Sequence, residues 1–545
     1  MQQPLEKNRI VSLTIDGMTA EGNGVGRYEG MAVFVPRTAV GDVLDVKIVK
    51  VCKHFAYGIP MTVHTPSPDR TEPDCPVYRQ CGGCLFRHIT YAAECRIKQQ
   101  FVTDAFARIG GLHPQVLPIL GAEQTNGYRN KAQLPCGKSP EGSGIAFGFY
   151  APRSHRLVYQ HGCLLQPPSF QPVIDRCAAL LAHIAPYDET SGKGILRHLY
   201  LRQGHHSHEM MVCFVVAKPV RKELESIAVL LAEEFPHITS VMMNVNPRKT
   251  NVILGSETLC LCGKPYIEDV FCGIPVQLNP HSFYQVNTPQ AQRLFAEVRR
   301  LAQPQKHHLL LDLYCGTGVI GLTMADAVDK LIGVEVVPQA VENAKENARA
   351  IGAENARFFA GDAGEIAKQL AGENLRPHII TLDPPRKGCD EPTLDACIAM
   401  APDTIVMVSC NPATAARDAK YLSQHGYRVE ALRPVDLFPR TGHVETVCLL
   451  SKLNAKQHIE INLDMDELDL TDAEKKATYQ EIKDYVLEHS GLKVSSLYIA
   501  QVKQKCGIIE RENYNKPKSE DAKQPQCPPD KEKAIKEALM HFGMI

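Results

Sequence analysis

The stretch between residues 309 and 335 constrains the fold of this chain more than any other. Residues 309–313 form an apolar run that leads into a glycine-rich turn, residues 319–327 have a helical pattern, and residues 331–334 form a second apolar run that ends in Glu335. This order predicts a βαβ unit of a parallel sheet, with Glu335 at the carboxyl end of its second strand. A carboxylate at that place can accept hydrogen bonds from both hydroxyls of a ribose.

The glycine turn differs from the two common phosphate-binding loops. Its pattern over residues 312–318 is D-x-x-C-G-x-G, which is neither G-x-G-x-x-G nor a P-loop that ends in Lys-Ser or Lys-Thr. Together with Glu335, such a turn suits an adenosyl ligand that has no pyrophosphate. We therefore predict that this domain binds S-adenosylmethionine.

Two further acidic residues follow predicted strands. Asp362 comes after the apolar residues 358–360, where it could meet the amino group of an adenine. Asp383 comes after residues 379–382, and we expect it beside the transferable methyl group. The two prolines after Asp383 fix the backbone and remove two N–H donors. A D-P-P turn after a strand is a feature of methyltransferases that act on planar bases.

A reactive cysteine is predicted at the exit of another core strand. Residues 405–408 are four apolar residues in a row, and Asn411 with Pro412 ends the strand. Ligands of α/β sheets bind at this exit, so Cys410 is our candidate nucleophile. The alternative is that Cys410 is a small buried side chain, which is the commoner role of a cysteine.

The last strand of this domain is predicted from residue 444 onward. Glu445 at its start then faces the same end of the sheet as Cys410, and we take it as the candidate general base. It can also be an ordinary acid at a strand edge. His443 is a rival for the acid–base role.

Three closely spaced cysteines predict a metal site. Cys75, Cys81 and Cys84 have the spacing C-x5-C-x2-C, and the two glycines between the last two are expected to free the backbone so that both thiols converge. Cys163 is our candidate for a fourth ligand, although the sequence leaves four others open: Cys52, Cys95, Cys136 and Cys177. Four thiolates without a histidine pair suit a [4Fe-4S] cluster.

The sequence leaves other interpretations of these cysteines open. Structural zinc sites usually show two ligand pairs, whereas this chain has one C-x2-C. Radical enzymes that use S-adenosylmethionine have the spacing C-x3-C-x2-C, which does not occur here. The cysteines can also remain without a ligand.

Composition limits the class of protein and its compartment. A length of 545 residues predicts three or four domains. Residues 1–6 do not resemble a signal peptide, and 19 cysteines without an export signal indicate a reducing compartment, so we expect a cytoplasmic protein. No apolar run reaches the roughly 18 residues of a membrane span. The net charge of −1 gives no general attraction to nucleic acid, so RNA binding must come from local basic patches.

The remaining segments have distinct patterns. Residues 1–62 alternate short β-rich segments with glycine-rich turns, which predicts an OB-like barrel with a tight turn at residues 22–27 and a cationic edge. The central region, residues 63–280, is predicted to contain a helix at residues 91–109, a basic and aromatic cluster at residues 128–131, and a strand at residues 196–202 whose cationic face could hold phosphates.

The end of the chain is predicted to be a separate module. Residues 454–477 form an acidic linker, and residues 478–545 form a small helical appendage with three helices, at residues 478–488, 495–505 and 531–541. The appendage can be a helix-turn-helix module or a plain protein-contact element.

With these motifs in place, the chain resembles the RNA uracil-5-methyltransferase family, specifically its iron–sulfur branch that modifies 23S ribosomal RNA. The resemblance covers about residues 10–452 and includes four motifs in the family's order. It implies a multidomain α/β protein with a TRAM barrel, a central α+β iron–sulfur region, a Rossmann-like S-adenosylmethionine methyltransferase domain at residues 281–453, and the helical appendage outside the family pattern.

The resemblance also implies roles for individual residues. Cys75, Cys81, Cys84 and Cys163 match the cluster ligands; Gln285, Tyr314, Glu335 and Asp383 match cofactor positions; Cys410 matches the nucleophile and Glu445 the catalytic base. Asp362 is added to the cofactor site from its place after a strand.

The implied reaction is methylation of uridine C5 in RNA, for which 23S ribosomal RNA is the expected substrate. Uracil C5 is too weak a nucleophile to attack a sulfonium methyl, and addition of a thiolate at C6 creates an enolate with charge density at C5. The base must leave its stack, so a single-stranded or loop region is expected. We expect a monomer, and no protein partner can be deduced.

Three alternatives remain open from the sequence. A transfer RNA uracil-5-methyltransferase and an RNA cytosine-5-methyltransferase would use the same cofactor and a cysteine. A non-catalytic RNA-binding or assembly factor would use the barrel, the cluster and the appendage without the reaction.

Overall fold

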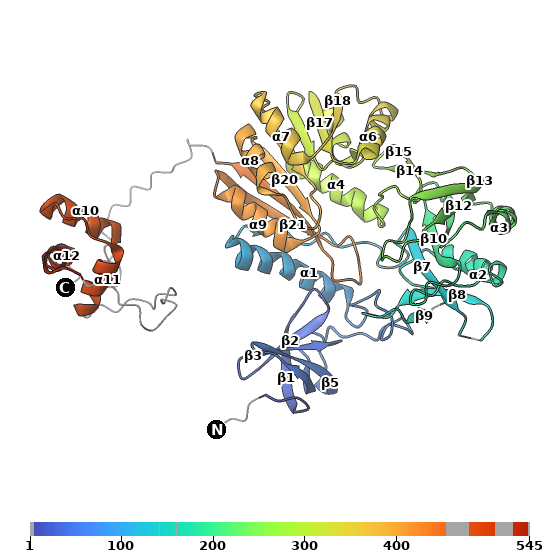
Figure 1. Cartoon of the computed structure of the whole chain (residues 1–545), viewed down its shortest axis with the longest axis horizontal. Helices are drawn as coiled ribbons and strands as arrows, with labels where there is room; N and C mark the ends of the chain where they lie inside the picture. The colour runs from blue at the N-terminus through green and yellow to red at the C-terminus, as the bar shows by residue number, and fades with distance from the viewer. Residues whose placement is uncertain (1–4, 141, 160, 454–478, 507–526, 543–545) are drawn as a thin grey trace. The chain divides into compact units, whose positions relative to one another are not determined.

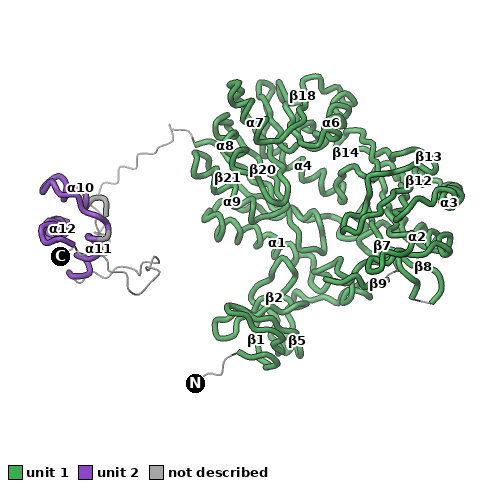
Figure 2. Tube along the Cα trace, viewed as in Figure 1, with its two compact units in different colours: residues 1–455 green, residues 456–545 purple. Residues whose placement is uncertain are grey.

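The computed structural model forms two compact units, residues 1–455 and residues 456–545 (Figures 1 and 2). It describes residues 5–140, 142–159, 161–453, 479–506 and 527–542. Within these residues, no helix is both long enough and apolar enough to cross a membrane.

The first part of unit 1 is a closed barrel with the strand order β1-β2-β3-β5-β4. Its strands are β1 (Ile10–Met18), β2 (Asn23–Tyr28), β3 (Met31–Pro36), β4 (Val43–Val51) and β5 (Phe55–Thr65). Alternate side chains of the strands point inward and form a core of valine, leucine and isoleucine. The predicted OB-like barrel is therefore confirmed.

The glycine-rich segment at residues 22–27 is not the predicted tight turn. Only Gly22 has a left-handed backbone, with a φ of 77°, and the residues after it form strand β2. Gly24 and Gly26 are glycines for a different reason. A β-carbon on Gly24 would collide with the Thr38 hydroxyl, and one on Gly26 would lie 2.8 Å from the carbonyl oxygen of Thr14. The glycines allow the strands of a small barrel to approach closely.

The central region is built around a seven-stranded sheet with the order β13-β12-β11-β10-β7-β8-β9. Its strands are β7 (Lys131–Lys138), β8 (Ile145–Tyr150), β9 (Leu157–Tyr159), β10 (Leu196–Gln203), β11 (Met210–Val216), β12 (Ile238–Val245) and β13 (Glu257–Gly263). Helices α2 (Phe170–Leu180) and α3 (Arg221–Glu234) contribute to its core. A hairpin of β14 (Ile267–Phe271) and β15 (Ile274–Leu278) follows.

Strand β10 exists as predicted, but its cationic face does not meet solvent. The strand lies between β7 and β11, and Arg197, His198 and Arg202 are buried. The guanidinium of Arg202 donates hydrogen bonds of 2.8 Å to the carbonyl oxygens of Asn279 and Ser282. These arginines therefore hold loops of the protein together, and the expected phosphate contact at this strand is wrong.

The last part of unit 1 is an eight-stranded sheet with the order β18-β17-β16-β19-β20-β22-β21-β6. Its strands are β6 (Gln115–Val116), β16 (Leu309–Leu313), β17 (Lys330–Glu335), β18 (Ala356–Ala360), β19 (Ile379–Leu382), β20 (Thr404–Ser409), β21 (Tyr427–Val435) and β22 (Glu445–Lys452). The strands from β18 to β20 are parallel, and β22 runs antiparallel to β20. This is the predicted Rossmann-like fold.

Helices cover both faces of this sheet (Figure 1). They are α1 (Tyr91–Ala105), α4 (Thr288–Ala302), α5 (Val319–Leu322), α6 (Pro338–Ala350), α7 (Ala363–Gly372), α8 (Glu391–Met400) and α9 (Pro412–Ser423). Because both faces are buried, the central strands are apolar at nearly every position, which explains the runs in the sequence.

Two predicted helices are interrupted. The segment 319–327 contains the short α5 and a separate 3-10 turn at Ala325–Ala327. The predicted helix 91–109 ends as α1 at Ala105 and continues as a π-helical turn, Phe106–Gly110. Helix α1 packs beside α9, and β6 pairs with β21. Packing therefore runs across the predicted boundary between the central region and the methyltransferase domain.

Unit 2 contains three helices in its described part: α10 (Tyr479–Ser490), α11 (Ser496–Lys505) and α12 (Pro529–His541). They match the three predicted helices, and the Ser495 hydroxyl caps α11 by accepting from the backbone N–H of Tyr498. Apolar side chains from all three helices share one core. The predicted acidic linker lies outside the described residues.

Candidate active site

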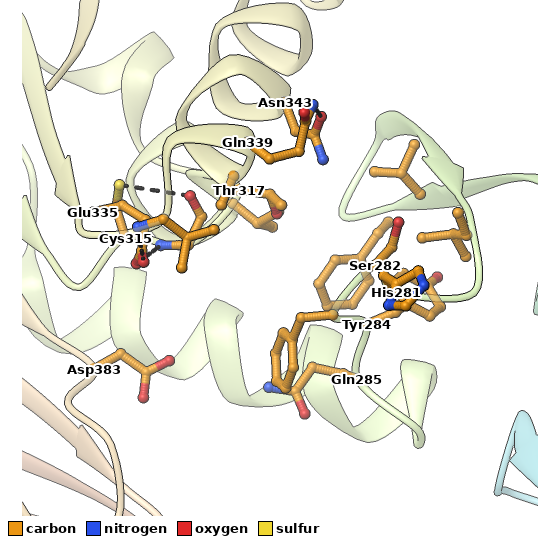
Figure 3. A pocket seen from close by; sticks show the side chains of 18 of the residues that line it. His281, Ser282, Tyr284, Gln285, Cys315, Thr317, Glu335, Gln339, Asn343 and Asp383 are labelled. Atoms are coloured by element: carbon orange, nitrogen blue, oxygen red, sulfur yellow. Dashed lines mark hydrogen bonds between the residues drawn. The ribbon is translucent and has the colours of Figure 1, made fainter. Parts of the chain in front are cut away.

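The carboxyl ends of the parallel strands open into one cavity of about 2010 Å³. The strand order reverses between β16 and β19, and ligands of open α/β sheets bind at such a point. All seven residues predicted for the cofactor site and the chemistry line this cavity: Gln285, Tyr314, Glu335, Asp362, Asp383, Cys410 and Glu445. Figure 3 shows Glu335 and Asp383 on one side, facing Tyr284 and Gln285.

Glu335 is held in place by the glycine turn. The backbone N–H of Gly316 donates to one of its carboxylate oxygens at 3.0 Å, and the N–H of Val337 donates to the other at 2.9 Å (Figure 3). The turn reaches this position through left-handed backbone at Tyr314 and Gly316, with φ values of 61° and 55°. Glu335 is thereby fixed at the rim of the cavity with free lone pairs on both oxygens.

Asp362 has a structural task as well as a place on the cavity wall. It is the N-cap of α7, and one of its carboxylate oxygens accepts from the N–H groups of Gly364 and Glu365. The side chain of Tyr314 is held by Thr393, because the two hydroxyl groups lie 3.2 Å apart. Both side chains are thus positioned by the chain around them.

The thiol and the candidate base lie on neighbouring strands. Cys410 directly follows β20, and Glu445 begins β22, which pairs with β20 so that Ser409 stands opposite Thr446. Asn411 caps α9, which starts at Pro412, so the chain turns sharply at the thiol. Cys410 is half-buried and Glu445 is buried.

His443 does not share this position. Its side chain is exposed and it does not line the cavity, whereas Glu445, two residues later, does. The geometry therefore favours Glu445 over His443 as the group that can exchange a proton with a molecule bound beside Cys410.

Burial changes the proton affinity of this group of side chains. Burial and then the charge of Asp383 raise the pKa of Glu445 to about 8, against the opposing effect of Arg386. Burial and the neighbouring Asp312 raise the pKa of Asp383 to about 7. Burial also raises the pKa of the Cys410 thiol, and Glu445 adds to that rise while Arg386 lowers it. Groups that titrate near neutrality in a cavity are candidates for acid–base chemistry.

The four predicted cysteine ligands line a second, smaller cavity of about 260 Å³. Cys75, Cys81, Cys84 and Cys163 all border it, and none of the four rival cysteines does. The guanidinium of Arg87 lies 3.3 Å from the Cys84 sulfur. Neither glycine between Cys81 and Cys84 has a left-handed backbone, so the convergence of these thiols does not depend on glycine conformations as predicted.

The two cavities share a wall. Arg129, Lys131 and Gln133, at the start of β7, border both the cysteine cavity and the large cavity at the strand ends. Burial, then the charges of Arg202 and Arg129, lower the pKa of Lys131 to about 8. Within the described residues, no three His, Cys, Asp or Glu side chains lie close enough together to hold one metal ion.

Comparison with known proteins identifies the family. The sequence profile of tRNA (uracil-5-)-methyltransferase matches residues 205–453, and that of the TRAM domain matches residues 4–61. An uncharacterized RNA methyltransferase from Halalkalibacterium halodurans is 39% identical over 456 residues, which are 83% of this chain and 99% of the relative. The chain belongs to the tRNA (uracil-5-)-methyltransferase family. A second uncharacterized RNA methyltransferase, from Staphylococcus aureus, is 36% identical over 452 residues, covering 82% of this chain and 99% of the relative.

A solved structure agrees with this methyltransferase assignment. The tRNA (uracil-54, C5)-methyltransferase of Pyrococcus abyssi, solved with S-adenosyl-L-homocysteine, has a TM-score of 0.64 and 25% identity, covering 81% of this chain and all of that one. The likeness extends over most of unit 1, so this chain has the S-adenosylmethionine-dependent methyltransferase fold.

The segment before Glu445 connects the methyltransferase site to the rest of unit 1. We call residues 436–443 the junction loop. Its carbonyl groups accept hydrogen bonds from four other segments: Asn287 to Leu437 (3.0 Å), Lys98 to Phe438 (3.1 Å), Tyr128 to Pro439 (2.9 Å) and Leu85 to Arg440 (2.7 Å). The segment just after Gln285, helix α1, the basic cluster at residues 128–131 and the segment just after Cys84 therefore meet at the loop that leads to the candidate base.

A buried charge cluster anchors this loop, and we call Glu94, Lys98, Asp436 and Arg440 the junction cluster. The ammonium of Lys98 lies 2.8 Å from Glu94 and 2.7 Å from Asp436, and all three side chains are fully buried. The N–H of Arg440 donates to Glu94 at 2.6 Å, and the hydroxyl of Tyr91 donates to Asp436 at 2.8 Å. The formal charges of two cations and two carboxylates cancel in this cluster.

Sequence reasoning missed three parts of this site. Arg386 is a cation beside Cys410 and Glu445, and its position directly after the D-P-P turn was the available signal. Asp312 is buried and joins β16 to β19, because its carboxylate accepts a hydrogen bond of 2.6 Å from the Thr381 hydroxyl. The junction cluster gave no signal, because Lys98 and Asp436 lie 338 residues apart in the sequence.

Proposed function

We propose that this chain transfers the methyl group of S-adenosylmethionine to C5 of uridine in RNA through a covalent adduct between Cys410 and uracil C6. The observation that carries the proposal is the placement of Cys410, Glu445 and three further strand-end carboxylates around one cavity. A nucleophile and a base at adjacent strand ends suit a reaction that begins with addition and ends with removal of a proton.

The residues at the glycine turn fit S-adenosylmethionine. Glu335 has free acceptor positions for the two ribose hydroxyls, and Asp362 and Tyr314 extend the same wall. Bound S-adenosylmethionine supplies an electrophilic methyl group on a sulfonium. In this proposal Asp383 and Gln285 border the space that the methyl group and the uracil share.

Each step on the base uses a group of this chain. The thiolate of Cys410 adds to C6, and the electron pair of the C5–C6 double bond moves onto C5 and the O4 carbonyl. C5 then forms a bond to the methyl group. The bond between the methyl carbon and the sulfonium sulfur breaks, and its electron pair stays on the sulfur. Glu445 removes the C5 proton, and the electrons of the C5–H bond restore the double bond and release Cys410.

Arg386 and the raised pKa values match these tasks. Arg386 lowers the pKa of Cys410 and so favours the thiolate against the effect of burial. The raised pKa of Glu445, about 8, makes its carboxylate a stronger base than that of an ordinary glutamate, and the carboxylate is the major form above about pH 8.

We also propose a [4Fe-4S] cluster bound by Cys75, Cys81, Cys84 and Cys163. Such a cluster takes one thiolate on each iron, so it needs four thiols around a cavity and not three ligands on one ion. The shared wall at Arg129 and Lys131 supports a bracing role for RNA contact. We expect Cys163→Ser, purified without oxygen, to lose bound iron and visible absorbance, while Cys136→Ser keeps both. Equal iron in the two variants would contradict the assignment.

For the substrate we propose 23S ribosomal RNA, because the four-cysteine pattern resembles the branch that modifies it. Transfer RNA is the second candidate, which the name of the matching solved structure favours. The recombinant chain should methylate a 23S transcript in preference to a transfer RNA transcript, and the reverse preference would assign it to transfer RNA.

The reaction itself is tested by release of tritium from RNA that carries 5-tritiated uridine. Wild-type protein should release tritium in the presence of S-adenosylmethionine, and Cys410→Ala should release none above background, because no C6 adduct can form. Binding of S-adenosylhomocysteine controls for an intact cofactor site. Cys397→Ala, at a buried cysteine of α8 away from the cavity, is the matched variant that should retain release. Full release by Cys410→Ala would overturn the mechanism.

A further inference from the structure

The outer face of the barrel carries an aromatic cluster that the cavity does not use. Phe34 on β3 and Phe55 and Tyr57 on β5 lie with ring centroids 5.6 to 5.7 Å apart. Phe34 stands directly opposite Tyr57 in the strand register. Their neighbours Val33, Val35 and Ala56 point into the core, so the three rings point outward.

The rings are held by one another and remain accessible. Phe55 meets Tyr57 edge to face, with an angle of 90° between the ring planes, and meets Phe34 at 68°. Tyr57 is 40% exposed. Rigid rings of this kind can stack on a flat ligand without losing much conformational entropy.

The same strand continues the exposed apolar surface. Ile59, Met61 and Val63 follow Tyr57 at alternate positions of β5, and Met61 is 53% exposed. An apolar row along one strand of a small barrel is unusual on a surface that has no partner. The face is therefore a candidate docking surface.

The charges beside the rings indicate which partner it takes. Lys50 on β4 stands opposite Tyr57, and Lys47 stands opposite Ile59. Lys53 and His54 occupy the turn between the two strands, and residues 46–57 contain no acidic side chain. Aromatic rings that alternate with cations suit unpaired nucleotides, whose bases stack and whose phosphates attract lysine.

We propose that Phe34, Phe55 and Tyr57, with Lys47 and Lys50 beside them, form a stacking surface for an unpaired segment of RNA. We call this the aromatic face. The inference rests on the proposed function for the identity of the substrate. Unpaired bases of the same RNA would stack on the rings, so the barrel would select RNA that has a single-stranded stretch.

The full-length protein tests this with two RNA probes of one length, a single-stranded 12-mer and a blunt duplex, at one salt concentration. Tyr57→Ala should weaken binding of the single strand about tenfold, because a base–aromatic stack is lost, while duplex binding changes little. Tyr57→Phe should bind as wild type does. Val229→Ala, at an exposed apolar residue of α3, is the matched control and should also bind normally.

A lysine variant separates stacking from charge. Lys50→Ala should weaken both probes and reduce the dependence of affinity on salt, because a phosphate contact is lost. In the methylation assay, Tyr57→Ala should raise KM for RNA and leave kcat within about twofold. A normal unfolding midpoint and normal S-adenosylhomocysteine binding show that the variant is folded.

Unchanged binding of the single strand by Tyr57→Ala would overturn the proposal, as would an equal loss for single strand and duplex. No binding of the single-stranded probe by the wild-type protein would also overturn the proposal. A protein would then be the remaining candidate partner for the aromatic face. If the aromatic face binds RNA as expected but no tritium is released from uridine, the proposed function fails while this inference stands.

Discussion

Two groups of charged side chains flank the segment from residue 436 to residue 445, one fully buried around Lys98 and one at the wall of the large cavity, and they are built in opposite ways. In the junction cluster, two cations meet two carboxylates, and Lys98 contacts both acids within 2.8 Å. At the cavity, the acids Asp383 and Glu445 lie beside the Cys410 thiol, and Arg386 is the cation that affects both Glu445 and Cys410.

The difference separates a structural from a reactive use of burial. Where opposite charges are matched, a buried ion group fixes the position of a loop. At the cavity, burial and a neighbouring carboxylate raise the pKa values of Asp383 and Glu445 to about 7 and about 8, and Arg386 opposes the rise for Glu445. Burial also raises the pKa of Glu94 against the charge of Lys98, so the two groups differ in their ion pairs and not in the direction of these shifts. The balanced cluster thus positions the segment that ends in the unbalanced one.

Breaking the balanced cluster should give the largest effect on stability. Lys98→Met removes the cation and leaves two carboxylates buried without it, which should cost about 3–5 kcal/mol of unfolding free energy. Thermal or urea unfolding measures this loss. Lys345→Met, which breaks an exposed ion pair on α6, is the matched control and should cost at most about 1 kcal/mol.

A second variant shows whether charge or packing causes that loss. Lys98→Met combined with Glu94→Gln and Asp436→Asn removes the buried charges together and should recover part of the stability. If Lys98→Met alone is as stable as the wild-type protein, the junction cluster does not anchor the loop.

At the cavity, Glu445 should make the stability of the fold depend on pH. The folded-state pKa of Glu445 is raised from 4.5 to about 8, so ionising it in the folded protein destabilises the fold. The contribution of protonated Glu445 to the stability is fully present below about pH 4.5 and is lost as the pH rises through 8. The thermal unfolding midpoint of Glu445→Gln should therefore lie about 3 °C or more above that of the wild-type protein at pH 9. At pH 4.5 the two midpoints should be equal.

Glu233→Gln, at an exposed position of α3, controls for the loss of one carboxylate and should leave the midpoint unchanged at both pH values. A Glu445→Gln midpoint that follows wild type across the whole pH range would mean that Glu445 is not held in an unfavourable charged state.

The sequence predicted the parts of this site that depend on strands and turns. An apolar run followed by Asp383 or Cys410 places the side chain at a sheet end whatever the rest of the chain does, because parallel strands end at one edge. The four cysteines could be grouped because their spacing and the resemblance agreed, and they border one cavity.

The sequence could not predict what depends on distant pairing. Arg202 alternates with apolar residues as a solvent-facing cation would, yet strands on both sides bury it and loop carbonyls accept its hydrogen bonds. Gly24 looks like a turn residue, but it is a strand glycine because Thr38 leaves no room for a side chain. Lys98 and Asp436 meet only after α1 has packed against the methyltransferase sheet.

The most direct test of the account is a covalent complex with RNA. Because Glu445 is proposed to remove the C5 proton and so free Cys410, Glu445→Gln should stop after methyl transfer with RNA still bound to the thiol. Incubation with S-adenosylmethionine and uridine-containing RNA should give a protein–RNA band that survives denaturing electrophoresis, and Cys410→Ala with Glu445→Gln should abolish it. Normal turnover by Glu445→Gln without a band, or a band that persists in the double variant, would contradict the account.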